Sequence, residues 1–228
     1  GVCSEFIGLD NIFFDASHVA AGCIKISFTM GTTIGPSAFC TGFRDAGIRV
    51  VQGHETMIQA SWLSAYFWDE ESVTEPAHVA IELNGQDNYV TDVIVFCCGQ
   101  DTAVLVNGAA TILSGVHSWG GPITINGSYT IQDRVLGCYI DYSTLEIVNP
   151  SMVIVQDNFF FNGHARLHGR KLRSLVFREN IYSLDDYGGS LGIVLADEVQ
   201  ASDCEGVVIE DEINGEYNLQ DWRLRSTR

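Results

Sequence analysis

A chain of 228 residues is long enough for one domain with a continuous core, and a content of 46% hydrophobic against 18% charged residues excludes a disordered chain. The formal net charge of −17 argues against nucleic acid as a partner, because phosphates would be repelled over most of the surface. No apolar run reaches the ~18 to 20 residues of a membrane span, and no signal peptide is found.

The composition and the ends of the chain give three further expectations. The 23 glycines and 12 phenylalanines, with few Lys or Glu, favour a β-rich protein. Because the chain begins at GVCSEFIGLDN without a methionine, we interpret it as a processed or partial chain. The seven cysteines lack the CxxC spacing of zinc sites, so we expect no metal and no cofactor. Disulfides in a secreted protein and buried free thiols both stay open.

In chain order, one repeated frame accounts for most of the sequence. The frame is carried by DNIFFD (10–15), ASWLSA (60–65), DVIVFC (92–97), GVHSWG (115–120), CYIDYS (138–143), DNFFFN (157–162) and ENIYSL (179–184). Its first shared position falls on Asn11, Ala60, Asp92, Gly115, Cys138, Asn158 and Asn180, mostly 20 to 23 residues apart. Apolar strands such as IRVV and AIEL precede the frame, with turns at Gln52-Gly53, Asn84-Gly85 and Asn107-Gly108.

Short strands at this period, without helical periodicity between them, predict a β-solenoid. Each coil buries its inward side chains against the coils above and below, with strands ~4.8 Å apart. Neither a leucine-rich consensus nor the four strands per ~40 residues of a propeller is present. We therefore predict an all-β, right-handed parallel β-helix of roughly nine coils. It forms one domain over residues 1–228, with additional N-terminal coils in a longer chain.

Four ordered segments resemble a known family. QGHETMI (52–58), NGQDNYVTDVIVF (84–96), ATILSGVHSW (110–119) and RVLGCYIDYS (134–143) are similar to segments of the plant QUARTET-type polygalacturonases, in the pectin-lyase-like superfamily. The resemblance implies a β-helix that hydrolyses polygalacturonate or a similar acidic polysaccharide outside the cell. The ordered Asn-Thr-Asp, Asp-Asp, Gly-His-Gly and Arg-Ile-Lys signature of typical family 28 glycoside hydrolases is missing, so the resemblance supports the fold more than catalysis.

Two carboxylates lie in the segment LNGQDNYVTDV. On the repeated frame Asp92 shares the position of Asn158 and Asn180, an inward ladder that satisfies backbone groups at a bend. Asp87 follows Gly85 as Glu55 follows Gly53, and two stacked carboxylates would repel each other, which raises one pKa. Catalysis, calcium binding and solvated turns are all compatible with this pattern.

The remaining candidates for acid–base chemistry are Asp141, His54 and His117. Asp141 lies two coils from Asp92, or ~9.6 Å before any lateral offset, which is close to the separation in inverting glycosidases. On the frame, however, one of the two points inward and the other outward. His117 shares the column of Phe13 and Trp62, which favours a core histidine, whereas His54 lies in a turn beside Glu55.

A basic stripe and an aromatic loop are candidates for substrate binding. In NGHARLHGRKLR, the residues His164, Arg166, His168 and Arg170 alternate, so a strand would present them on one face. Arginine forks match carboxylates, so the stripe suits uronate groups; ion pairs with neighbouring acidic coils are the alternative. The long loop AYFWDEESVTEP offers Tyr66 and Trp68 to shelter a groove, or to cap the core or a partner chain.

Two functional hypotheses follow. The first is a secreted glycoside hydrolase that acts on a uronate-containing glycan through Asp87, Asp92 and Asp141, with a lyase as a close variant. The second is a non-catalytic glycan-binding or structural β-helix module in a larger extracellular assembly, where a partner protein or further coils cover an end of the solenoid.

Overall fold

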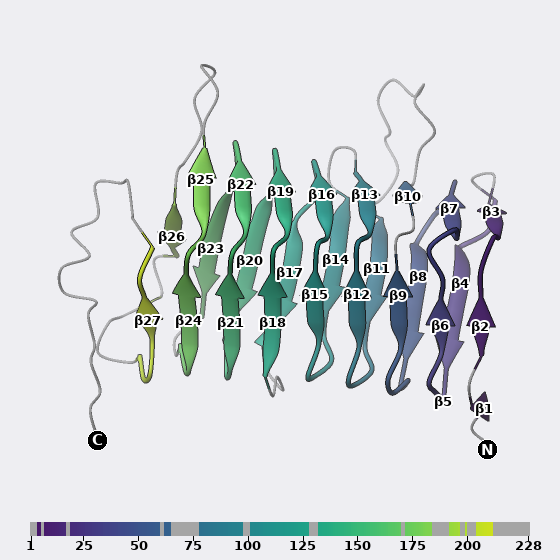
Figure 1. Ribbon diagram of the computed structural model, residues 1–228, viewed down its shortest axis with the longest axis horizontal. Coiled ribbons are helices and arrows are strands. Elements are labelled where there is room, and N and C mark those ends of the chain that lie inside the picture. The colour runs from purple at the N-terminus through teal and green to yellow at the C-terminus, as the bar shows by residue number, and fades with distance from the viewer. Residues whose placement is uncertain are drawn as a thin grey trace.

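The computed structural model describes residues 4–5, 7–16, 19–59, 62–64, 78–97, 101–127, 132–169, 172–183, 192–196, 199 and 204–211. Within these ranges every long element is a β-strand, and every strand pairing is parallel. Figure 1 shows the strands winding into a right-handed solenoid, upward in the front layer and downward behind it. The predicted all-β parallel β-helix is confirmed.

Three long sheets run along the solenoid, and each coil contributes one strand to each sheet. Sheet I contains β2 (Gly8–Leu9), β6 (Thr33–Ile34), β9 (Met57–Gln59), β12 (Tyr89–Thr91), β15 (Ile112–Ser114), β18 (Asp133–Leu136), β21 (Val153–Gln156), β24 (Leu175–Arg178) and β27 (Val208–Ile209). Sheet II contains β3 (Phe13–Asp15), β7 (Phe39–Thr41), β10 (Trp62–Ser64), β13 (Ile94–Phe96), β16 (His117–Trp119), β19 (Tyr139–Asp141), β22 (Phe159–Phe161) and β25 (Ile181–Ser183).

Sheet III contains β4 (Gly22–Ser27), β8 (Ala46–Val51), β11 (Val79–Leu83), β14 (Thr102–Val106), β17 (Ile123–Asn126), β20 (Thr144–Val148), β23 (His164–His168) and β26 (Ile193–Leu195). A small sheet pairs β1 (Ser4–Glu5) with β5 (Thr29–Met30). In the described residues the three long sheets hold nine, eight and eight strands, close to the roughly nine coils predicted. No helix among the described residues is long and apolar enough to cross a membrane.

The core is built from the inward side chains of the three long sheets, stacked coil on coil. In sheet I these are Val90, Leu113, Val135, Val155 and Phe177, all at 0% exposure. Their neighbours along each strand face outward, as the period of two requires. Burying one such side chain contributes about 1.5 to 3 kcal/mol, and a solenoid sums these terms between neighbouring coils.

The corner between sheets I and II is two residues long and corrects the register of the repeated frame. Its first residue has a positive φ in each of five coils: 54° at Asp92, 64° at Gly115, 58° at Gly137, 58° at Asp157 and 59° at Glu179. The sequence frame instead matched Asp92 with the residues that follow the last three. It was therefore one residue out of register from Cys138 onward.

The predicted inward ladder exists, but Asp92 is not part of it. Asn158 accepts a hydrogen bond from the backbone N–H of Cys138 (2.8 Å) and donates to the side chain of Asn180 (2.8 Å). Asn180 in turn donates to Asp211 (2.7 Å). Asp92 lies one position earlier, at the exposed, left-handed residue of the corner. Asn, Asp and Gly tolerate that conformation best, which explains the residue type there.

Three glycines close the corner between sheets III and I. Gly53, Gly85 and Gly108 follow one another on successive coils, and their amide planes approach so closely that a Cβ on Gly85 or Gly108 would collide with the backbone of the preceding glycine. The Gly-containing turns predicted from sequence are confirmed, and the reason is a close approach of backbone to backbone.

Candidate functional site

The structure distributes the predicted site residues over different faces. Sheets I and II form the front layer and sheet III the back layer in Figure 1. His117 and Asp141 lie on sheet II, whereas His164, Arg166 and His168 lie on sheet III. Asp92 occupies the corner between sheets I and II, and His54 and Asp87 occupy the corner between sheets III and I. Tyr66, Trp68 and Arg170 lie outside the described residues.

His117 and Asp141 come together on adjacent strands of sheet II. In the register of β16 and β19, His117 pairs with Tyr139 and Trp119 with Asp141. His117 Nε2 lies 3.5 Å from Asp141 Oδ2, and the side chains are 32% and 15% exposed. The expectation of a core histidine is wrong: His117 shares the column of Phe13, Trp62 and Ile94, as in the repeated frame, but this column faces outward.

Aromatic rings surround this pair. The imidazole of His117 stacks on Tyr139, with ring centroids 4.5 Å apart and planes inclined by 15°. Tyr139 also contacts Phe159 at 5.4 Å. Trp119 and Tyr142 are 40% and 51% exposed beside Asp141. Burial raises the pKa of the Tyr139 phenol, and the neighbouring Asp141 carboxylate raises it further.

One polar atom of each side chain is covered by the surrounding residues. His117 Nε2 and Asp141 Oδ1 are buried, and neither makes a hydrogen bond within the described part of the chain. The His117 side chain is nevertheless 32% exposed, so part of it away from Nε2 is accessible. An imidazole with a carboxylate at one nitrogen and solvent at the other can transfer a proton at the exposed nitrogen while the carboxylate fixes its orientation.

Asp92 is too far from Asp141 to act with it. The two residues are two strands apart, about 9.6 Å across the sheet. Asp141 also lies four residues past Gly137, the residue equivalent to Asp92, which adds about 13 Å along the strand. Neither side chain points into the core, so the inward and outward assignment was wrong as well. The pairing considered for an inverting glycosidase therefore does not form.

His54 and Asp87 form a second, more exposed pair. Asp87 and Glu55 occupy equivalent positions on successive coils, as the sequence predicted, because both have positive φ (54° and 53°) and their coils pair at His54 and Gln86. His54 Nδ1 lies 3.8 Å from Asp87 Oδ2, and both side chains are about half exposed, at 47% and 49%. The solvated-turn alternative accounts for this corner without any chemistry.

The basic stripe lies on the outward face of sheet III. His164, Arg166 and His168 alternate along β23 as predicted, opposite Thr144, Glu146 and Val148. His168 Nε2 contacts Glu146 Oε2, so one member is already paired with a neighbouring acidic coil. Burial lowers the pKa of His164; Arg166 lowers it further, and Glu146 opposes them.

Of the two opposed charged residues at the centre of this stripe, Arg166 was predicted from sequence and Glu146 was not. Arg166 is exposed and makes no ion pair in the part of the chain that the structure describes. Glu146 was not singled out from sequence. The available signal was its position as the single charged residue at an outward site of the strand TLEIV.

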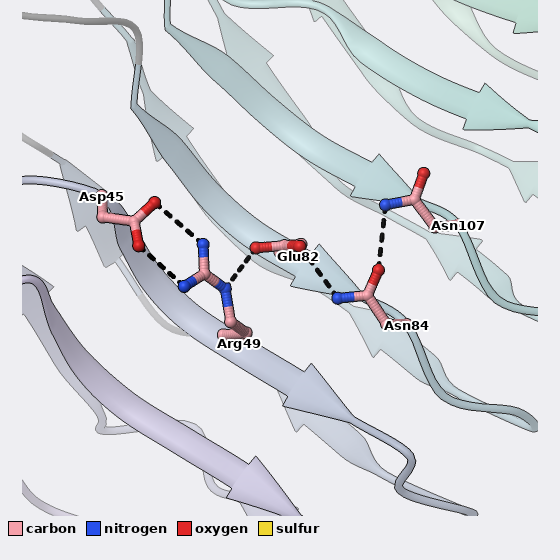
Figure 2. Close-up of polar contacts among 5 residues, drawn as sticks. All are labelled: Asp45, Arg49, Glu82, Asn84 and Asn107. Atoms are coloured by element: carbon pink, nitrogen blue, oxygen red, sulfur yellow. Dashed lines mark hydrogen bonds and ion pairs between the residues drawn. The ribbon is translucent and has the colours of Figure 1, made fainter.

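Elsewhere on sheet III the charged side chains pair with one another in a network that links three coils (Figure 2). The guanidinium of Arg49 binds Asp45 through both terminal nitrogens (2.7 and 2.8 Å) and Glu82 through Nε. The network continues through Asn84, which donates to Glu82 (2.8 Å), and Asn107, which donates to Asn84 (2.9 Å). Bonding to Arg49 lowers the pKa of Asp45, so these groups are satisfied by one another.

A third histidine–aspartate pair is buried. His78 binds Asp101 Oδ1 through both its backbone N–H (3.0 Å) and its Nδ1 (2.8 Å), and the side chains are only 4% and 6% exposed. This pair joins two successive coils at the start of β11 and β14 and offers no open edge to a substrate. No group of three or more metal-ligating side chains occurs in the described ranges.

Comparison with known proteins agrees with the motifs. No family model matches the chain. The chain is 28% identical, over 227 residues, to the protein named polygalacturonase QRT3 of Arabidopsis thaliana. The match covers 92% of this chain and 46% of that protein, so the chain spans about half the length of the curated relative it matches. The resemblance to QUARTET-type polygalacturonases, and to a pectin-lyase-like β-helix, is confirmed.

Proposed function

We propose that this chain is a polysaccharide-active β-helix that hydrolyses an acidic glycan, with His117 and Asp141 as its acid–base pair. The observation that carries the proposal is the approach of His117 Nε2 to Asp141 Oδ2 on an outward, aromatic face. The name of the relative, a polygalacturonase, supports a uronate-containing substrate in an extracellular setting.

The chemistry assigned to the pair is proton transfer at the glycosidic bond. Asp141 holds the imidazole through Nε2, and Nδ1 exchanges a proton with the glycosidic oxygen or with the attacking water. The exposed rings of Trp119 and Tyr142 lie where they can support the faces of sugar rings. Positioned acid–base groups of this kind contribute about 10²- to 10⁴-fold to a rate.

Arg166 is assigned to binding at a distance from the reaction. Sheet III faces away from sheet II, so a sugar at His117 does not contact Arg166 (Figure 1). As an exposed cation without an ion pair in the described ranges, Arg166 suits a carboxylate of another part of a long polymer.

A second candidate function is glycan binding without hydrolysis. The strand neighbours of Asp141 in sheet II are Trp119 and Phe161, so no second carboxylate flanks it there. Typical glycoside hydrolases use two carboxylates. A module that only binds polysaccharide would keep the aromatic face and need no proton transfer.

The test compares two histidine–aspartate pairs of one chain. Purified protein is incubated with polygalacturonate, alginate and neutral glycans, and both new reducing ends and the ultraviolet absorbance of unsaturated products are measured. We expect new reducing ends without absorbance, a loss of about 10²-fold or more in Asp141→Asn and His117→Gln, and no change in Asp87→Asn. Glycan affinity, measured separately, should persist in all three.

Each other outcome selects an alternative. Unsaturated products would mean a lyase. Binding without any product would establish the non-catalytic function. Equal activity in Asp141→Asn and the folded parent would remove the pair from the mechanism.

A further inference from the structure

Two cysteines meet at the first coils of the solenoid. Cys23 lies in β4 of sheet III and Cys40 in β7 of sheet II. Cys23 Sγ lies 3.6 Å from the carbonyl oxygen of Thr41 and 3.8 Å from that of Phe14. Thr41 follows Cys40 in the chain, and Phe14 is the register partner of Cys40 on the adjacent strand. The Cys23 thiol therefore lies beside Cys40, although the two residues belong to different sheets.

The two thiols differ in access and acidity. Cys23 is partly exposed, whereas Cys40 is completely buried. A hydrogen bond between the two side chains is the largest influence on both: it lowers the pKa of Cys23 and raises that of Cys40. An accessible thiol of lowered pKa is the attacking partner in thiol–disulfide exchange, and a buried neighbour is the partner that resolves the mixed disulfide.

We propose that Cys23 and Cys40 form a disulfide that fastens the first coil of the described solenoid to the second, with a small disulfide such as glutathione disulfide as oxidant. The Cys23 thiolate attacks one sulfur of glutathione disulfide, and one glutathione leaves as its thiolate. Cys40 then gives up its proton, its thiolate attacks the Cys23 sulfur, and the second glutathione leaves. Two protein thiols are oxidised, and one glutathione disulfide is reduced to two glutathione molecules.

The position of this disulfide gives it a structural role. In the described residues β3 and β4 are the last strands of sheets II and III, so each is paired along one edge. Each coil of a solenoid contacts only its neighbours, so the interface of these two coils depends on local contacts. A link between residues 23 and 40 restricts the unfolded chain and holds this interface together. The inference does not depend on glycan hydrolysis.

The experiment measures pairing directly. Folded full-length chain is equilibrated with mixtures of reduced and oxidised glutathione, alkylated, digested and analysed by mass spectrometry. We expect a linked Cys23–Cys40 peptide in oxidising mixtures. In Cys40→Ala, glutathione should accumulate on Cys23, whereas in Cys23→Ser it should not appear on Cys40, because Cys40 is buried. Cys138→Ser is the matched control, since burial raises the pKa of its thiol to about 12.

A second readout keeps the proposal testable if Cys40→Ala does not fold. Oxidation should raise the thermal midpoint of the parent chain by about 5 to 10 °C and leave that of Cys23→Ser unchanged. Alkylation of both Cys23 and Cys40 in the folded, oxidised parent, or pairing of either with another cysteine, would overturn the proposal.

Discussion

The His117–Asp141 and His54–Asp87 pairs each join a histidine to an aspartate, with nitrogen–oxygen distances of 3.5 and 3.8 Å, yet they differ in their surroundings. The first lies on a strand between stacked rings, and its contacting nitrogen is covered. The second lies on a turn with both side chains about half in water. Water and salt weaken the electrostatic attraction between exposed charges. The comparison therefore teaches that packing against neighbouring side chains, rather than this attraction, fixes the geometry of such a pair.

The His78–Asp101 pair extends the comparison into the core. Its side chains are 4% and 6% exposed, and a single carboxylate oxygen accepts two hydrogen bonds from one histidine. The three histidine–aspartate pairs thus differ mainly in how deeply their side chains are buried. The contribution of a charged or polar contact to stability should increase with its burial, and the following predictions test this from the largest effect to the smallest.

Removing the buried carboxylate should have the largest effect. Asp101→Ala leaves the ring and the backbone N–H of His78 without this acceptor in the core, which costs about 3 to 5 kcal/mol of unfolding free energy. Urea denaturation followed by circular dichroism measures the change. A loss below about 1 kcal/mol would mean that water reaches this corner and replaces Asp101 as the hydrogen-bond acceptor for His78.

A buried carboxylate without a histidine should make stability depend on pH. Asp133 is 0% exposed, Oδ1 accepts the backbone N–H of Thr111, and Oδ2 has no partner in the described part of the chain. Burial raises its pKa from 3.8 to about 7. Because the folded pKa exceeds the unfolded value, the folded chain binds more protons between these values, and its contribution to stability falls as pH rises from about 4 to 7.

The expected size of this loss is up to about 4 kcal/mol, and Asp133→Asn should abolish it. Unfolding free energies of both proteins at pH 4, 5, 6 and 7 measure the effect as a difference. Parallel curves for the variant and the parent would show that folding does not shift the pKa of Asp133.

A partly exposed pair should matter less. Arg49→Met removes the links to Asp45 and Glu82 but keeps an apolar stem over sheet III, so we expect a loss below about 1 kcal/mol that shrinks further at high salt. Denaturation at low and high ionic strength provides the check. A large and salt-independent loss would contradict the comparison.

The smallest effect belongs to the exposed corner. Asp87→Asn keeps a residue that tolerates the φ of 54° and removes only the solvated contact to His54, so stability should change by less than about 0.5 kcal/mol. Asp87→Val is a useful contrast, because a β-branched residue is strained in that conformation.

The coil period could be predicted because inward Val, Ile and Leu recur wherever a strand passes the core. The exact register could not, since the frame was aligned on residue type: it matched Asp92 with Asn158, although Asp157 holds the equivalent left-handed corner. Gly115 and Gly137 at that corner carried the correct signal. A shift of one residue moves a side chain to the other face, and from Cys138 onward it placed the buried Ile140 and Phe160 in the column of the outward-facing His117.

The candidate site was predictable only in part for the same reason. His117 and Asp141 were both chosen from sequence, but their contact depends on the pairing of β16 with β19, across a whole coil. By contrast, His164, Arg166 and His168 lie within one strand. Their common face could be predicted because alternate residues of a strand point to the same side.

The corners of the solenoid differ in how much chain they accept, and this has a consequence for protein engineering. Between sheets I and II every complete corner from Asp92 onward spans two residues, and between sheets III and I glycine backbones touch at Gly85 and Gly108. Between sheets II and III, by contrast, Asp141 and Thr144 are separated by two residues but Ser64 and Val79 by residues 65–78. A longer peptide placed between Ser64 and Val79, where the chain already has a long connection, should therefore be tolerated, whereas insertion at a glycine corner should split the stack into two unconnected halves.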